Sequence, residues 1–401
     1  MGYLSYFLFI ILSNSRFSRS ILLIFMINNK ITLFQFGLIQ LSYYSIRFLS
    51  EFPSGVLADY IKRKYSMAIG SLLASLSGIL LYSTSFLDIP GYFWVFLILF
   101  SLDAMASSFL SGSDQAMLYD YLKRKGLESK YPKFLGWREA IAAISLGTTT
   151  IIGGFLASKS INLPFLWQGI LFLLATLVIL FFPENKSVTI KERVSRTTPL
   201  KIASEGLNVI KRIPTIQFLV LFMTTLAAST NTVTIFIQGY FNELNISTNS
   251  IGIIYGICTV LSALAAINSY HLTKLTLKTI LIITTSMFFV GIICLLTEYI
   301  PLVIFGFFLI YLKLDFLEPS VYFFLNKYVK EEVRATVLSF FGTALNFVTL
   351  IMYPLYGIVG EQSGYKGMIF GMSILSIPLF IYLFIFYKKY KVGDSKTSIS
   401  V

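Results

Sequence analysis

The sequence is poor in the residues from which most enzyme and metal sites are built. Among its 401 residues it has one histidine and two cysteines, and His271, Cys258 and Cys294 lie apart from one another in or beside apolar segments. This distribution supports no disulfide framework, His/Cys metal site or nucleophile–base pair. A GxxxxGK[ST] phosphate loop is also missing, which argues against ATP-driven pumping by this chain. We therefore expect no enzyme activity, no catalytic residues, no metal and no cofactor.

Charge is also scarce, and one sign dominates. Only 13% of the residues are charged while 56% are hydrophobic, and the mean hydropathy is +0.77. This composition excludes an ordinary soluble domain and indicates a membrane protein. The 32 Lys and Arg residues outnumber the 19 Asp and Glu residues, which gives a formal net charge of +13. The excess lies in short loops between apolar runs, so it fits membrane topology and anionic lipid better than nucleic acid.

Apolar runs of roughly 20 residues, the length that crosses about 30 Å of hydrocarbon as a helix, recur along the whole chain. They predict an all-α integral membrane protein with twelve spanning helices, at residues 4–27, 34–57, 66–86, 92–118, 137–158, 163–182, 216–240, 249–270, 279–297, 302–326, 334–357 and 367–387. The first run lacks the basic n-region and small-residue cleavage site of a signal peptide, so we expect it to be retained.

One long charged connection divides the helices into two sets of six. The predicted parts are an amino-terminal bundle, a basic cytoplasmic linker, a carboxy-terminal bundle and a basic cytoplasmic tail, at residues 1–182, 183–215, 216–387 and 388–401. Lys and Arg residues gather in alternate loops, for example at 62–64 and 123–133. Because positive residues collect in cytoplasmic loops, both termini are expected inside. The sequence thus predicts a multi-pass plasma-membrane protein, which we expect to be a monomer in contact with membrane lipids.

An internal repeat supports the division into two halves. FLSGSDQAMLYDYLK (109–123) and FLEPSVYFFLNKYVK (316–330) share Phe, Leu, Ser, Leu, Tyr and Lys in register, at the ends of the fourth and tenth predicted helices. GLIQL (37–41) likewise matches GIIYG (252–256), at the starts of the second and eighth. Two related six-helix halves of this kind place a substrate site between them, near the bilayer midplane.

The turn between the second and third helices carries the most specific motif. GVLADYIKRKY (55–65) resembles the loop signature of the major facilitator superfamily through Gly55, Leu57, Ala58, Asp59, Arg63 and Lys64. The helix number and the repeat extend this resemblance over essentially the whole chain. Lys62 stands where the family has glycine, so we expect a turn that is more strained or less tightly packed than usual.

Further stretches resemble a bacterial branch of that superfamily rich in drug and antibiotic exporters. They are EFPSG (51–55), SGSDQAMLYDYL (111–122) and RATVLS (334–339). GTTTIIGG (147–154) is similar to the glycine-rich signature of the superfamily's antiporters, without its usual proline, although small residues at this spacing also serve plain helix packing. The resemblance implies a bacterial protein and an antiport mechanism.

The residues of the turn have both a local and a family interpretation. Locally, Gly55 permits close packing of the hairpin, Asp59 accepts hydrogen bonds from free N–H groups at a helix start, and the cations hold the loop in the cytoplasm. The resemblance implies conformational switching, in which Asp59, Arg63 and Lys64 bond to the opposite half in one state and release it in another. Arg47 and Glu51, four residues apart on one helical face, are expected to neutralise each other.

Ionisable residues inside the apolar runs are the candidates for coupling and substrate binding. Each charge at the bilayer centre costs about 2.5 to 3.5 kcal/mol and usually faces a cavity or a partner. In the superfamily the first, fourth, seventh and tenth helices line the central cavity, and these helices here carry Arg16, Arg19, Asp103, Asn231, Gln238, Lys313, Asp315 and Glu318. As one long helix, the first segment would bring Arg16 and Arg19 roughly onto one face.

Two interpretations of these charges stay open. In the first, Arg16 or Arg19 pairs with Asp103, and Lys313 pairs with Asp315 or Glu318, purely as buried struts. In the second, the pairs form and release during transport, and one acid carries a proton; Asp315 is slightly preferred because of its charged neighbours. Tyr43 and Tyr44 add aromatic surface to an amphipathic site.

Together these observations predict a secondary transporter that moves a small amphipathic molecule, such as an antibiotic or toxic metabolite, out of the cell in exchange for protons. Proton-coupled uptake of a small nutrient or metabolite is the nearest alternative. A non-transporting membrane receptor on the same fold is a third possibility, although it does not need so many buried ionisable groups.

The topology is tested by labelling. Single cysteines replacing Lys30 or Lys366 should react with an impermeant maleimide in intact cells, because these lysines are expected in external loops. Cysteines replacing Lys191 or Lys389 should react only after the cells are opened. Labelling of either of the latter two from outside would show that the inside-inside arrangement is wrong.

Overall fold

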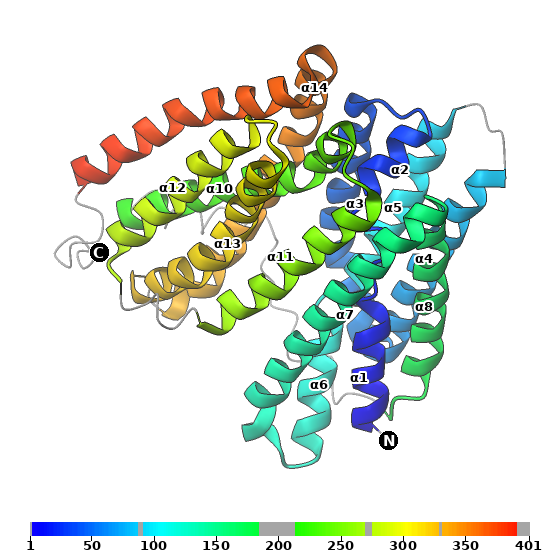
Figure 1. Cartoon of the computed structure of the whole chain (residues 1–401). Helices are drawn as coiled ribbons and strands as arrows, with labels where there is room; N and C mark the ends of the chain where they lie inside the picture. Colours follow the sequence, from blue (N-terminus) through cyan, green and yellow to red (C-terminus); the bar gives the residue numbers. More distant parts are fainter. Residues whose placement is uncertain (1, 87–90, 184–212, 269–274, 329–330, 391–401) are drawn as a thin grey trace. The chain divides into compact units, whose positions relative to one another are not determined.

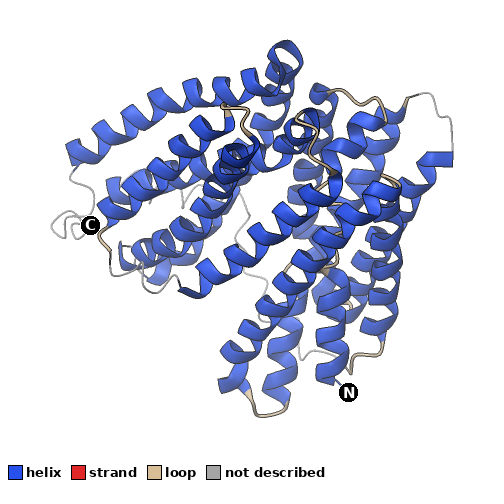
Figure 2. Cartoon of the chain, viewed as in Figure 1, coloured by secondary structure: helices blue, strands red, loops and turns tan. Residues whose placement is uncertain are grey.

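A computed structural model describes residues 2–86, 91–183, 213–268, 275–328 and 331–390 (Figure 1). These residues form helices joined by short turns and contain no strand (Figure 2). Most of the expected linker, 183–215, and of the expected tail, 388–401, lies outside the described residues.

The helices of the first half are α1 (Gly2–Ser13), α2 (Leu22–Asn28), α3 (Leu33–Tyr60), α4 (Arg63–Ser83), α5 (Tyr92–Leu110), α6 (Ser113–Arg124), α7 (Tyr131–Lys159) and α8 (Leu163–Leu180). Those of the second half are α10 (Pro214–Glu243), α11 (Thr248–Asn268), α12 (Leu277–Leu295), α13 (Ile300–Tyr328) and α14 (Glu331–Tyr390).

The expected all-α membrane fold is confirmed, with three differences in how the segments are built. Within the described residues, nine stretches are long and apolar enough to cross a membrane as helices. The first predicted segment is divided into α1 and α2, and the fourth turns at Gly112, between α5 and α6, where φ is 71°. The last two predicted segments run together as α14, which is interrupted at Gly364 with φ 69° and ψ 179°.

The repeat is visible in two local features of the backbone. Gly112 separates α5 from α6, and its counterpart in the repeat, Pro319, lies inside α13. Both residue types disturb a helix, glycine by its conformational freedom and proline by its missing N–H. A residue that disfavours the helix therefore stands at the same repeat position in each half, although α13 continues across Pro319 whereas Gly112 separates two helices.

A matching turn follows the first and the seventh segments. Lys30 and Asn245 adopt left-handed φ values of 60° and 59°. The next residue donates back across the turn in both cases, from Ile31 N–H to Met26 C=O at 3.1 Å and from Ile246 N–H to Phe241 C=O at 2.9 Å. This is the Schellman pattern that satisfies the last carbonyls of a helix. A Thr or Ser hydroxyl then caps the next helix in each half.

By proximity of Cα atoms the chain forms two compact units. Unit 1 contains Met1–Val194 and Phe241–Val260, and unit 2 contains Ser195–Tyr240 and Leu261–Val401. In unit 1, α4 packs on α5 and α8, α3 packs on α5, and α1 packs on α8. In unit 2, the principal helix pair is α12 with α13.

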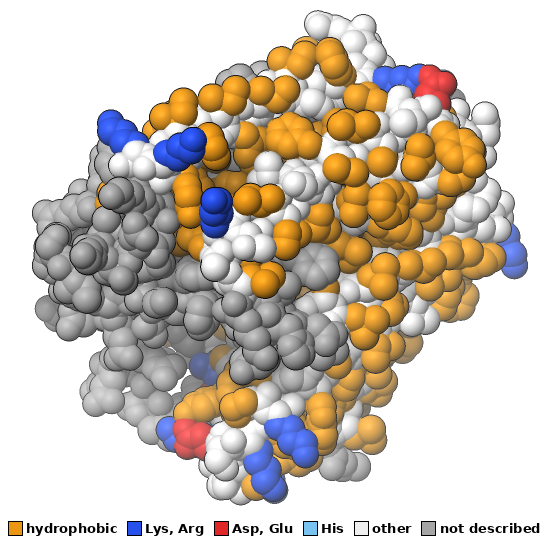
Figure 3. Space-filling view, turned by 60° about the vertical axis from the view of Figure 1, so that its left-hand side comes forward, with side chains coloured by type: hydrophobic (Ala, Val, Ile, Leu, Met, Phe, Trp, Pro, Cys, Tyr) orange, Lys and Arg blue, Asp and Glu red, His pale blue; other side chains and the backbone are white. Residues whose placement is uncertain are grey.

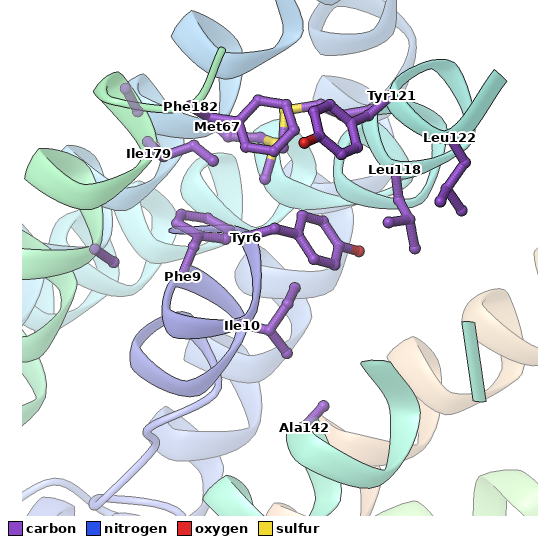
Figure 4. Packing of buried hydrophobic residues seen from close by; sticks show 13 residues of the cluster. Tyr6, Phe9, Ile10, Met67, Leu118, Tyr121, Leu122, Ala142, Ile179 and Phe182 are labelled. Atoms are coloured by element: carbon purple, nitrogen blue, oxygen red, sulfur yellow. The ribbon is translucent and has the colours of Figure 1, made fainter. Parts of the chain in front are cut away.

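The packing in unit 1 is rich in aromatic side chains. Tyr6 of α1, Met67 of α4, Tyr121 of α6 and Phe182 after α8 belong to one buried cluster (Figure 4). The ring centroids of Tyr121 and Phe182 lie 5.2 Å apart. Lipid tails are as apolar as these side chains, so such contacts hold helices together chiefly through close van der Waals packing.

Glycine pairs bring helix backbones together at three places. They are Gly78 with Gly169 between α4 and α8, Gly154 with Gly252 between α7 and α11, and Gly291 with Gly306 between α12 and α13. A Cβ atom on Gly154 would lie 2.5 Å from the carbonyl oxygen of Thr248 and 2.9 Å from Cα of Gly252. The glycine-rich stretch 147–154 thus serves helix packing, as small residues do in membrane bundles.

Gly153, on the same helix, gives a sharp test of this packing. Its Cβ position overlaps the carbonyl oxygen of Phe17, a backbone atom that cannot swing aside. We expect Gly153→Ala to lower the apparent melting temperature of the detergent-purified protein, because overpacking costs about 1 to 3 kcal/mol.

Gly147→Ala is the matched control, because its nearest neighbour, a methyl group of Thr259, would be 3.6 Å from the new Cβ. Alanine there should be neutral or stabilising by about 0.5 to 1 kcal/mol through helix propensity. Equal melting temperatures for the two variants would mean that the backbone of α7 does not pack closely against Phe17.

Candidate functional site

The first membrane segment is broken at its polar centre. Residues 14–21 separate α1 from α2, where the sequence predicted one continuous helix, so the expectation that Arg16 and Arg19 share a helical face is wrong. Asn14 Nδ2 donates to Ile10 C=O at 2.8 Å and Ser15 Oγ donates to Ile11 C=O at 2.8 Å. These short polar side chains bond to the backbone and favour the end of a helix over its interior.

Neighbouring helices satisfy the polar groups of the break. Ser18 Oγ donates to Gln168 Oε1 of α8 at 2.9 Å, and Ser145 Oγ of α7 donates to Ile11 C=O at 2.6 Å. Ser15, Ser18 and Ser145 are all buried. Non-helical backbone at membrane depth is tolerated where protein supplies its hydrogen bonds, and α7 and α8 do so here.

Arg16, inside the break, forms an ion pair with Asp103 of α5. One guanidinium nitrogen, Nη1, lies 2.8 Å from Oδ1 and 3.0 Å from Oδ2 of the carboxylate. Asp103 is 9% exposed and Arg16 is half-buried, so the acid is the more enclosed member of the pair. Of the two arginines considered from the sequence, the structure gives Arg16 this partner. Arg19 lies half-buried in the same break.

Hydroxyl and aromatic groups complete the surroundings of the pair. Arg16 Nη2 is 3.5 Å from Ser107 Oγ, one turn along α5, and that oxygen is 3.0 Å from the hydroxyl of Tyr43 on α3. The Arg16 guanidinium carbon lies 4.8 Å from the ring centroid of Phe172 on α8. The site therefore offers a cation, an acid, two hydroxyls and an aromatic face, contributed by the break and three helices.

Unit 2 holds a buried cation in a different setting. Lys313 of α13 is fully buried, its Nζ lies 3.9 Å from the ring centroid of Phe288 on α12, and it has no hydrogen-bond partner among the described residues. The expected pairing of Lys313 with Asp315 or Glu318 is not formed. Residues two or five apart on a helix point in different directions, and Asp315 is half-buried while Glu318 is exposed.

The two polar candidates on α10 differ in burial. Gln238 is buried and Asn231 is half-buried. They stand seven residues apart, which is two helical turns, so both lie on one face of α10. Buried Ser229, Thr230 and Thr232 accompany them.

The turn before α4 makes its contacts within unit 1. Arg63 forms an ion pair with Asp120 of α6. Lys64 Nζ donates to the carbonyls of Leu180 and Phe182 at 3.2 and 3.3 Å, where free C=O groups follow the end of α8. Lys62 has φ −66° and ψ 140°, an ordinary extended conformation, so the expected strain at this position is absent.

The remaining predictions for this turn are either not met or lie outside the described residues. A Cβ at Gly55 would meet nothing within 4 Å, so the close packing of the hairpin expected there is wrong. Arg47 and Glu51 are both exposed, and the structure shows no ion pair between these two described side chains. The side chain of Asp59 lies outside the described residues.

Sequence reasoning missed a second charged group in unit 1. Arg138 of α7 binds Asp114 of α6, with Nη2 at 2.6 Å and Nε at 2.9 Å from Oδ2, and its Nη1 lies 2.8 Å from Glu139. A signal was present, because Asp114 and Asp120 are the acidic residues of the stretch that carried the exporter resemblance. Each pairs with an arginine from another helix, which links α6 to α4 and α7.

Comparisons with known proteins agree on one family. The sequence profile described as Major Facilitator Superfamily matches residues 4–274 and, in a second overlapping match, residues 217–400. The uncharacterized MFS-type transporter YxaM of Bacillus subtilis (strain 168) is 22% identical over 384 residues, which are 94% of this chain and 93% of that protein.

Solved structures show the same fold. The nucleoside transporter NupG is 13% identical with a TM-score of 0.78, over 96% of this chain and 98% of its own. A D-xylose-proton symporter is 14% identical with a TM-score of 0.70, over the full length of both chains.

The setting of Lys313 leads to a stability prediction. A buried donor without an acceptor costs about 1 to 3 kcal/mol, and methionine has a similar length and a thioether that packs well on an aromatic ring. Lys313→Met should therefore raise the apparent melting temperature of the purified protein.

Lys159→Met, at the exposed end of α7, is the control and should change stability by less than about 0.5 kcal/mol. A lower melting temperature for Lys313→Met would mean that the ammonium group has a stabilising partner that this arrangement does not show.

Proposed function

The chain belongs to the major facilitator superfamily of membrane transporters, and on that basis we propose that it exports a small amphipathic molecule in exchange for protons. The ion pair between Arg16 and Asp103 is the observation that carries the proposal. A buried pair gains little over an apolar contact of the same size, because desolvation consumes most of its attraction. An ionic pair retained beside a broken membrane helix is therefore better explained by function than by stability.

The proposed coupling step uses groups that already touch. Protonation of the Asp103 carboxylate removes its negative charge, and the two short contacts to Arg16 weaken. The guanidinium remains near Ser107 and the ring of Phe172. There it can donate hydrogen bonds to a polar or anionic group of the substrate. An apolar substrate portion would have the half-buried ring of Tyr43 beside it, so the site suits an amphipathic molecule.

Asp103 is the preferred proton carrier over Asp315. The sequence slightly favours Asp315 because of its charged neighbours, but Lys313 has no acidic partner in the described structure. Asp103 has the contact with a cation that the mechanism requires to break, since both of its carboxylate oxygens lie near Nη1 of Arg16. Asp315, Glu318 and the fully buried Lys313 remain candidates for the substrate half of the cycle, together with Asn231 and Gln238.

The direction of transport rests on sequence resemblance. The stretches 51–55, 111–122 and 334–339 are similar to those of bacterial exporters, and 147–154 is similar to the antiporter signature. Uptake is the alternative, favoured by the likeness to structures described as a nucleoside transporter and a D-xylose-proton symporter. Export and uptake are both proposed here as proton-coupled. In either direction, Asp59, Arg63 and Lys64 are proposed to act in switching.

The first experiment searches for a substrate. Cells with and without the protein are compared for susceptibility to amphipathic antibiotics and for ethidium accumulation at several pH values. Lower accumulation in the presence of the protein supports export, higher accumulation supports uptake, and no difference for any compound supports the receptor alternative.

Asp103→Asn then tests the coupling. An asparagine amide does not take up a proton at this pH, so the variant should lose the transport that is driven by an imposed pH gradient. Energy-independent exchange of substrate should persist, because asparagine keeps the shape of the side chain and one acceptor oxygen.

Asp114→Asn is the matched control, because it removes the acid of a buried ion pair that the mechanism does not use. It should keep the pH dependence even where expression falls. Unchanged pH dependence in Asp103→Asn would reduce the pair to a structural strut, and Asp315→Asn would then be the next variant.

A further inference from the structure

A groove in unit 2 is lined by none of the residues of the Arg16 site. It has a volume of about 480 Å³ and lies between the start of α10, the first turns of α12 and the last turns of α14. Its walls are mainly aromatic and aliphatic, with Phe218, Phe222, Phe289, Phe380 and Phe384 contributing. Ile282 and Ile381 line it and are 55% and 54% exposed, so the groove opens sideways onto the surface of the unit.

Basic groups stand at one end of this apolar groove. Lys278, the second residue of α12, is part of the lining. Lys388, in the last turn of α14, has its Nζ 4.6 Å above the ring centroid of Phe384, which also lines the groove. Figure 3 shows Lys and Arg side chains on a surface that is otherwise rich in hydrophobic side chains.

Within the described segments that line the groove, no acidic residue accompanies these lysines. The described segments that form the groove, 214–225, 277–290 and 377–389, contain no Asp or Glu. The end with the lysines is the cytoplasmic end in the topology that the Lys and Arg distribution predicts. Inner leaflets carry anionic lipids, and basic pockets between membrane helices on that side recognise their head groups.

We propose that this groove binds an anionic phospholipid of the cytoplasmic leaflet. An acyl chain lies along the aromatic wall, and the phosphate lies between Lys278 and Lys388. The lateral opening suits a ligand that enters from the bilayer, and the basic end suits its negative head group. This inference does not depend on the direction or coupling of transport, because lipid binding is measured without a substrate.

The chain's own tail fits the groove poorly. Residues 391–401, KVGDSKTSISV, contain only Val392, Ile399 and Val401 as large apolar side chains, and they add both an aspartate and two lysines. Such a segment has too few large apolar side chains to cover the aromatic wall, and its own two lysines offset the charge of its aspartate.

The test uses the full-length protein purified in detergent and native mass spectrometry. Dioleoyl phosphatidylglycerol and dioleoyl phosphatidylcholine are titrated separately, and the bound fraction is measured. The protein should retain phosphatidylglycerol in preference to phosphatidylcholine. The double variant Lys278→Gln/Lys388→Gln should bind phosphatidylglycerol about tenfold or more weakly. Each lysine near an anionic lipid contributes favourably to the free energy of binding.

Two further variants make the result specific. Lys123→Gln/Lys159→Gln removes the same charge from exposed positions of unit 1 and should leave phosphatidylglycerol binding unchanged. Thr285→Trp fills the groove and should weaken both lipids. Each variant is first shown to elute and melt like the wild type in the absence of added lipid, and a variant that fails this is replaced by Lys278→Gln or Ser286→Trp.

Three outcomes would overturn the proposal. They are equal binding of the two lipids by the wild type, unchanged phosphatidylglycerol binding in Lys278→Gln/Lys388→Gln, and an equal loss in the control double variant. If phosphatidylglycerol binds only after removal of residues 391–401, the tail and not a lipid occupies the groove.

Discussion

Backbone N–H and C=O groups within hydrocarbon have no water to bind, and this constraint organises unit 1 around residues 14–21. The break between α1 and α2 frees several of these groups at membrane depth. Ser145 and Gln168 approach it from α7 and α8, and Gly153 lets the carbonyl of Phe17 come close. The break in the first membrane segment thus explains why α7 and α8 carry the polar residues Ser145 and Gln168 inside the membrane. Their hydroxyl and amide groups are parts of one hydrogen-bonded support.

The two units treat a buried cation differently. Arg16 has one carboxylate that neutralises its charge, with a hydroxyl and an aromatic ring also close by. Lys313 has the face of Phe288 and no hydrogen-bond acceptor among the described residues. An arginine suits a bidentate partner and a lysine is a compact point charge. The two related halves therefore differ in the polar groups around their buried cations. They still share local backbone structure, as the matching turns at Lys30 and Asn245 show.

The sequence predicted the membrane helices well, because hydropathy is summed over many residues and tolerates local exceptions. It predicted the partner of Asp103 to within two arginines, because a charge so deep in the membrane needs an opposite charge. It did not predict the break at 14–21, since the apolar residues on both sides outweigh the polar centre of that window. The pairs Arg63–Asp120 and Arg138–Asp114 join residues distant in sequence, and no local pattern encodes them. The Arg47–Glu51 spacing was suitable, but spacing alone does not bring two exposed side chains together.

The broken segment also has a mechanical consequence. A continuous helix is stiff and transmits rotation and tilt along its whole axis, whereas residues 14–21 join two short rigid rods by a bonded but non-helical joint. The rod at one end, α1, packs on α8, and the other, α2, leads directly into α3. Along the chain, a tilt of α3 therefore reaches α1 through the joint. Arg16 lies in that joint, so its guanidinium is placed where a displacement of one rod against the other is converted into a change of distance to Asp103.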